Sequence, residues 1–158
     1  MENFQDFYKG QKDKLFSYLI RMTGDYHLSM DIMQESFLRC FEKYRDKKLT
    51  ISLLYTIARN ALIDYSRKNK RKREFEQNSI DERNSQDDFY IKQEYRQVME
   101  AMKSLETDER EILSLVLTEN LKYREIASIM GIKESNVKVK VHRARTRLRE
   151  ILQQGDLS

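Results

Sequence analysis

The sequence of 158 residues has no proline, no tryptophan, only four glycines and one cysteine. Because glycine and proline form most tight turns, their scarcity argues against a protein built from β-hairpins. Cys40 has no second cysteine with which to form an internal disulfide, and no apolar stretch is typical of a signal peptide or a membrane span. The sequence therefore predicts an almost entirely helical protein of a reducing cytoplasm.

Positive charge is concentrated in two stretches of the chain. Residues 56–73 and residues 133–149 each carry seven Lys or Arg and one acidic residue. The remaining residues carry 16 basic and 24 acidic side chains, so the rest of the chain is acidic although the net charge of the whole is +4. One basic run alone is as typical of a solvated helix face as of a binding site. Two separated basic segments favour contact with a polyanion at two places.

Apolar residues recur at helical spacing in the first 72 residues and predict three helices. The first runs from about Phe4 to Met22 and stops at Gly24. The second starts with Ser29 as its N-cap and has Asp31 in its first turn, and the third spans residues 51–71. We expect the second and third helices to bury Met33, Phe37, Phe41, Tyr44, Leu54, Ile57, Ala58, Ala61, Leu62 and Tyr65.

Residues 74–88 are polar, with six acids and one arginine, and predict a linker because they cannot bury enough apolar surface to fold. Beyond them, apolar spacing predicts a fourth helix that ends near Leu105. Thr107 or Asp108 caps a fifth helix built on Ile112, Leu113, Val116 and Leu117. The predicted fold is all-α, with two small helical domains (1–72 and 90–158) joined by a flexible acidic linker (73–89).

The strongest local pattern, YREIASIMGIKESNV from residue 123, is that of a helix-turn-helix. This motif needs a small residue where its helices cross, a glycine in the turn that can adopt the left-handed conformation, and a branched apolar residue on the second helix. Ala127, Gly131 and Val137 stand at these places. The alternative is an αα-hairpin whose basic second helix is merely solvated.

The second helix of this motif is amphipathic. At 100° per residue, Val137, Val141 and Ala144 share a buried face and the opposite side is polar. In a major-groove helix, the outward residues of the first turns contact base edges and flanking cations contact phosphates. The candidate DNA-binding residues here are Ser135, Asn136, Lys138, Val139, His142, Arg143 and Arg145.

The helix at 51–71 has a second polar face, on which Asn60, Asp64, Arg67 and Arg71 fall within one narrow arc. Amide and carboxylate groups offer hydrogen bonds to base edges that a purely electrostatic patch lacks. The alternative is a helix end whose cations only favour its C-terminal dipole.

Four segments taken together resemble the extracytoplasmic-function (ECF) group of the bacterial sigma-70 family. They are LFSYLIRMTGD from residue 15, DIMQESF from 31, LYTIARNALIDYSRK from 54, and EREIL from 109 followed by the helix-turn-helix. The resemblance implies a sigma factor, which binds core RNA polymerase and directs promoter-specific transcription initiation. It also implies as partners the β′ clamp helices, the β subunit, promoter DNA and an anti-sigma factor.

The resemblance assigns roles to individual residues. The segment 31–37 looks like region 2.2, which docks on the β′ clamp helices, and residues 109–152 look like region 4, which reads the −35 element. The helix from Leu54 to about Arg71 looks like regions 2.3 and 2.4, which read and help open the −10 element. The implied polymerase-binding residues are Asp31, Gln34, Glu35 and Phe37, and the implied −10 residues are Asn60, Asp64, Arg67, Lys68 and Arg71.

The sequence departs from many relatives at two places. Leu53 stands near a position where relatives often carry Trp, and Val139 stands where relatives often have Ser. The apolar side chain of Val139 could contact a thymine methyl group, which would change the −35 preference.

Other functional classes are weighed against this interpretation. A helix-turn-helix regulator that acts without being a polymerase subunit would leave the second basic helix unexplained. An enzyme is remoter still, because the chain has only His27, His142 and one cysteine, with no clustered metal ligands. We therefore expect no catalysis, no cofactor, no metal and no direct membrane insertion, and a location in the bacterial cytoplasm or at a membrane-tethered anti-sigma factor.

Overall fold

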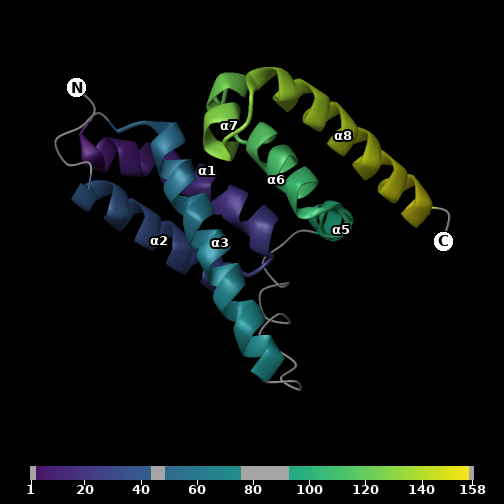
Figure 1. The fold of residues 1–158 in the computed structure, drawn as a ribbon, viewed down its shortest axis with the longest axis horizontal. Coiled ribbons are helices and arrows are strands. Elements are labelled where there is room, and N and C mark those ends of the chain that lie inside the picture. Colours follow the sequence, from purple (N-terminus) through teal and green to yellow (C-terminus); the bar gives the residue numbers. More distant parts are fainter. Residues whose placement is uncertain (1–2, 44–48, 76–92, 157–158) are drawn as a thin grey trace.

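The computed structural model describes residues 3–43, 49–75 and 93–156, and every regular element in these ranges is an α-helix (Figure 1). This confirms the all-α prediction. None of these helices is both long and apolar enough to cross a lipid bilayer. The helices are α1 (Phe4–Thr23), α2 (Tyr26–Lys43), α3 (Ile51–Phe75), α5 (Gln93–Lys103), α6 (Thr107–Val116), α7 (Tyr123–Met130) and α8 (Glu134–Asp156).

The boundaries of α3 and α5 bear on the expected linker. Helix α3 continues to Phe75, so residues 73–75 of the predicted linker are helical. The basic run at the end of α3 extends the helix because it contains no helix breaker. The rest of the expected linker, residues 76–89, lies outside the described residues, as does Tyr44.

The turn between α1 and α2 is set by Gly24, as the sequence predicted. Gly24 has φ 67°, and its N–H donates to the Ile20 carbonyl at 2.8 Å. The prediction that Ser29 caps α2 is wrong, because the Asp25 carboxylate directly after the turn accepts from the Leu28 N–H at 3.1 Å. Ser29 is instead buried inside α2, and its hydroxyl lies 2.8 Å from that of Thr23. Asp31 therefore lies in the second turn of α2.

The start of α6 also differs from the sequence prediction. Thr107 is the first residue of the helix, and Glu106 is the N-cap in place of Thr107 or Asp108. The Glu109 carboxylate accepts from the Glu106 backbone N–H at 3.2 Å, which satisfies one of the donors at this end. Leu117 follows the last residue of α6 and is exposed, against the expectation that it is buried.

The N-terminal half, α1 to α3, is built around an apolar core that includes Leu15, Leu19, Met33 and Leu54. Two residues expected in this core are exposed. Phe41 lies near the end of α2 and is 40% exposed, although its ring lies 4.8 Å from the ring of Phe4. Tyr65 is 42% exposed and lies in the second half of α3, a helix whose C-terminal end extends past α1 and α2 (Figure 1). The predictions of burial for Phe41 and Tyr65 were therefore wrong.

The C-terminal half contains the predicted helix-turn-helix, formed by α7 and α8. Gly131 ends α7 with φ 68°, and Ala127 and Val137 are buried where the two helices meet. Helix α6 packs against α8 and α7, and its Ile112 and Leu115 are fully buried. The three residue types that the motif requires thus occupy their expected positions.

The two halves pack against each other in this structure. Helix α1 contacts α6, and α3 contacts α7, which lies between α3 and α8 (Figure 1). Buried apolar residues of both halves form one continuous core cluster. Helices α3 and α8 carry the two DNA-binding surfaces expected from the sequence. They therefore belong to one packed unit, with α7 between them.

Two glycines test how the backbone conformation of this fold affects stability. Gly131→Ala should lower the free energy of unfolding by about 1 kcal/mol, because a Cβ is unfavourable at positive φ. Crowding does not contribute, since the added Cβ would meet no atom within 4 Å apart from its neighbours in the chain. Gly10→Ala, inside α1 and equally free of neighbours, should raise that free energy by about 0.5–1 kcal/mol because alanine is the better helix former. Urea unfolding of both variants measures these changes. Shifts of the same sign would contradict the assigned conformations.

Candidate nucleic-acid interface

The rotation of α8 about its axis is fixed by its buried side. Val137 and Ala144 are fully buried and Val141 nearly so, and Leu148 and Ile151 continue the same face as half-buried residues. The opposite side of α8 therefore faces solvent. All seven residues predicted to bind the −35 element have exposed side chains: Ser135, Asn136, Lys138, Val139, His142, Arg143 and Arg145.

The exposed face of α8 is strongly basic. Lys138, Arg143, Arg145, Arg147 and Arg149 are all exposed. Within the described part of the chain, no ion pair engages any of these cations. Their charge is therefore available to an anionic partner such as a phosphate backbone.

An apolar residue lies in the middle of this basic face. Val139 is 47% exposed. It is one turn after Ser135 and one turn before Arg143, so all three lie on the same side of α8. This face therefore offers a branched apolar contact between polar groups.

The outer part of α3 forms a second exposed polar surface. Asn60, Asp64, Arg67 and Lys68 are exposed, as the sequence predicted. Arg71 belongs to α3, but its side chain lies outside the described part. Sequence reasoning missed Tyr65, which has an exposed side chain. It lies between Asp64 and Lys68 in the sequence of α3. The only sequence signal for its exposure is the polar run of residues 66–74 that follows it.

The outer face of α2 carries three of the four residues expected to bind polymerase. Asp31, Gln34 and Glu35 are exposed. Phe37 is 3% exposed and its ring packs 4.8 Å from that of Tyr8, so it belongs to the core and not to a contact surface. Its assignment as a polymerase-binding residue conflicts with this burial. The sequence missed Leu38, which is exposed on α2.

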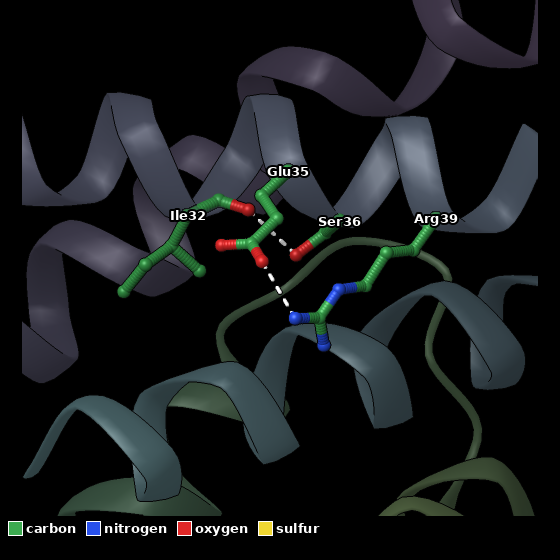
Figure 2. Close-up of polar contacts among 4 residues, drawn as sticks. All are labelled: Ile32, Glu35, Ser36 and Arg39. Carbon is green, nitrogen blue, oxygen red and sulfur yellow. Dashed lines mark hydrogen bonds and ion pairs between the residues drawn. The ribbon is translucent and has the colours of Figure 1, made fainter.

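Figure 2 shows how the polar side chains of α2 are arranged around Glu35. The Glu35 carboxylate and the Arg39 guanidinium point toward each other and form an ion pair at 2.6 Å. Ser36, one position further, is buried and donates to the Ile32 carbonyl at 2.6 Å. Because both members of the ion pair are about half exposed, their attraction contributes at most about 1 kcal/mol. A partner could therefore replace the pair at little cost.

Two features of the described residues concern metal binding and thiol reactivity. They contain no group of three or more His, Cys, Asp or Glu side chains placed to hold a metal ion. Burial raises the pKa of the Cys40 thiol, which favours its neutral and less nucleophilic form. The exposed faces of α2, α3 and α8 present polar groups to solvent.

Two sequence-family models match this chain. Sigma-70 region 2 matches residues 7–72, and Sigma-70 region 4 matches residues 95–148. The two matches cover the helices that carry the α2, α3 and α8 surfaces.

Among curated proteins, the ECF RNA polymerase sigma factor SigM of Bacillus subtilis is 32% identical over 156 residues, which span 95% of each chain. The ECF sigma factor SigX of the same organism is 27% identical and covers 94% of this chain and 83% of its own.

Solved structures share the fold. The sigma factor RpoE of Bartonella quintana, in complex with the anti-sigma factor NepR, superposes with a TM-score of 0.79 at 21% identity, over 97% of this chain and 98% of its own. CnrH, in complex with the cytosolic domain of CnrY, superposes with a TM-score of 0.73 at 18% identity, over 96% of this chain and 88% of its own. Together with the identity to SigM over nearly the full length of both proteins, these matches lead to one conclusion: the chain belongs to the ECF RNA polymerase sigma factors of the sigma-70 family.

Proposed function

We propose that this chain directs transcription initiation by reading a −35 element with α8 and a −10 element with the outer part of α3, while α2 docks on core RNA polymerase. The observation that carries the proposal is that α8 and α3 each bury one face and expose a polar, basic face. A regulator that acts without polymerase is not favoured, because the N-terminal half also matches a sigma-70 region.

In this proposal the chain itself makes and breaks no covalent bonds. Core polymerase supplies catalysis, and the chain supplies selectivity through its contacts with promoter DNA. It acts in the bacterial cytoplasm, where polymerase and DNA meet. RpoE is seen in complex with the anti-sigma factor NepR, and we extend this to an anti-sigma partner that holds the present chain inactive.

The −35 reading is assigned to the face of α8 around Val139. Arg143 and His142 can donate to acceptors on guanine, while Val139 can contact a thymine C5 methyl. Lys138 and Arg145 flank this row and are suited to the phosphates. We therefore expect the −35 preference to include a thymine opposite Val139.

Deoxyuridine in place of each −35 thymine tests this assignment, since it removes only the C5 methyl. With polymerase bound to the wild-type chain, one such replacement should weaken promoter binding roughly fourfold, the value of one buried methyl. Val139→Ser should abolish the sensitivity at that position. Lys138→Gln is the control, and it should weaken all promoters equally and lower the salt dependence. If the wild-type chain and Val139→Ser respond alike at every thymine, the contact is absent.

The −10 reading is assigned to Asn60, Asp64, Tyr65, Arg67 and Lys68 on α3. Opening the duplex costs about 1–2 kcal/mol of stacking for each base-pair step. An exposed aromatic ring can restore about 1–3 kcal/mol by stacking on an unpaired base. Tyr65 therefore supplies an aromatic surface in a chain that has no tryptophan.

Docking on polymerase is assigned to Asp31, Gln34, Glu35 and Leu38 of α2. This surface combines two carboxylates with one exposed apolar side chain. The combination suits a partner surface that has cations around an apolar centre. The β′ clamp helices are the partner that we infer from the family.

Removal of the two negative charges tests the docking surface. The double variant Asp31→Asn, Glu35→Gln should bind core polymerase roughly 3–10-fold more weakly, because interfacial charge pairs are lost. Its melting temperature should fall by at most a few degrees, since both side chains are exposed and the Glu35–Arg39 pair that is lost contributes at most about 1 kcal/mol. Glu100→Gln, an exposed acid on α5, is the matched control. Competition between labelled and unlabelled chain for core polymerase measures the affinities, and equal affinity of the double variant and the control would exclude this surface.

A further inference from the structure

Val139 is the apolar side chain that α8 presents on its exposed basic face. It is 47% exposed, whereas Val137 and Val141 on either side of it are 0% and 2% exposed. The residues one turn before and one turn after it, Ser135 and Arg143, are polar and exposed. The two methyl groups of Val139 are therefore available to a partner that contacts this face.

The direction of these methyl groups is set before any partner binds. The buried valines fix the rotation of α8 about its axis, and a β-branched side chain in a helix has one strongly preferred χ1 rotamer. Contact with Val139 therefore orders little that is not already ordered. A small apolar group placed against this side chain is then enough to change the affinity of the complex.

The pyrimidine bases differ in two ways at their major-groove edge. Thymine presents the O4 acceptor and a C5 methyl group, whereas cytosine presents the N4 amino donor and only a hydrogen at C5. A side chain with hydrogen-bonding groups distinguishes the acceptor from the donor, but valine has no such group and senses only the methyl. Cytosine methylated at C5 carries this methyl group on the same carbon as thymine. A valine contact by itself therefore does not distinguish thymine from 5-methylcytosine.

The polar residues near Val139 do not restore this distinction. Successive turns of an α-helix are about 5.4 Å apart, which exceeds the spacing of about 3.4 Å between stacked base pairs. Ser135 and Arg143 are each one turn from Val139, so they lie closer to neighbouring base pairs than to the one opposite Val139. A hydroxyl such as that of Ser135 also serves either base, because it donates to a carbonyl and accepts from an amino group. The pyrimidine opposite Val139 is therefore identified by its methyl group.

A pyrimidine without the methyl group leaves the contact with Val139 incomplete. Uracil and cytosine both have a hydrogen at C5, so a space the size of one methyl group separates the base from the side chain. The apolar contact across this space is lost, and one buried methyl is worth about fourfold in affinity. The loss should be the same for both bases, because the missing group is the same.

We propose that α8 binds a C5-methylated pyrimidine opposite Val139, so that 5-methylcytosine replaces thymine at this position of the −35 element and cytosine methylation there strengthens promoter binding. This inference rests on the proposed function of α8. It adds methylated DNA to the thymine contact already assigned to Val139. The chain then responds to chemical modification of a promoter as well as to its base sequence.

Four versions of each −35 pyrimidine test the proposal. Each position carries in turn thymine, uracil, 5-methylcytosine and cytosine. Thymine and uracil share one partner base, as do 5-methylcytosine and cytosine, so the affinity ratio within each pair isolates one methyl group. With polymerase bound to the wild-type chain, both ratios should be about four at the position opposite Val139. Fluorescence anisotropy of labelled promoter duplexes at fixed salt measures the affinities.

Three variants of α8 assign the effect to Val139. Val139→Ser removes the apolar contact and should bring both ratios to about one at that position. Val139→Ile keeps a branched apolar side chain and should keep both ratios near four. Lys138→Gln is the control at a neighbouring exposed position, and it should weaken binding to all four versions while leaving both ratios unchanged.

The outcomes separate this inference from the function on which it rests. A thymine effect without a 5-methylcytosine effect would overturn the inference and retain the thymine contact. A 5-methylcytosine effect that persists in Val139→Ser would also overturn it, because the methyl group would then act through the shape of the DNA. Ratios of one at every position would reject the Val139 contact but retain −35 reading by other residues of α8. Binding that does not require the −35 element would reject the proposed function, and the inference with it.

Discussion

The packing of Val137, Val141 and Ala144 against the other helices of the C-terminal half determines what α8 can present to DNA. These three residues occupy one side of the helix and are buried, so the helix cannot rotate without exposing them. Burial of one such side chain stabilises the fold by about 1–3 kcal/mol, and three of them make the orientation of α8 essentially fixed. The outward row from Ser135 to Arg143 is a direct consequence of this packing.

In α3, only the first turns bury side chains that fix the rotation of the helix about its axis. Leu54, Tyr55 and Ala58 are fully buried, which fixes the rotation of the whole helix. The later turns carry mostly exposed residues and keep the same rotation because a helix is stiff. The buried residues of the first turns therefore determine the direction in which Asn60, Asp64 and Arg67 point. Tyr65 is exposed for the same reason.

The helical period and the turn glycines made most of this arrangement predictable from the sequence. The buried stripe of α8, the αL residues Gly24 and Gly131, and the exposed −35 residues follow from local spacing. Phe41, Tyr65 and Leu117 could not be placed in this way, because their exposure depends on where neighbouring helices end. The Arg59–Glu111 pair joins residues 52 positions apart, and no local pattern predicts such a contact.

Run-off transcription with core polymerase tests the central claim most directly. The main template carries both promoter elements, and two companion templates each lack one of them. A further template has five extra base pairs, about half a helical turn, inserted between the −10 and −35 elements. The account predicts a discrete transcript that requires the chain, requires both elements and is lost when the insertion rotates them apart. A transcript that forms equally without the chain, or no polymerase-dependent start on any member of a promoter library, would contradict it.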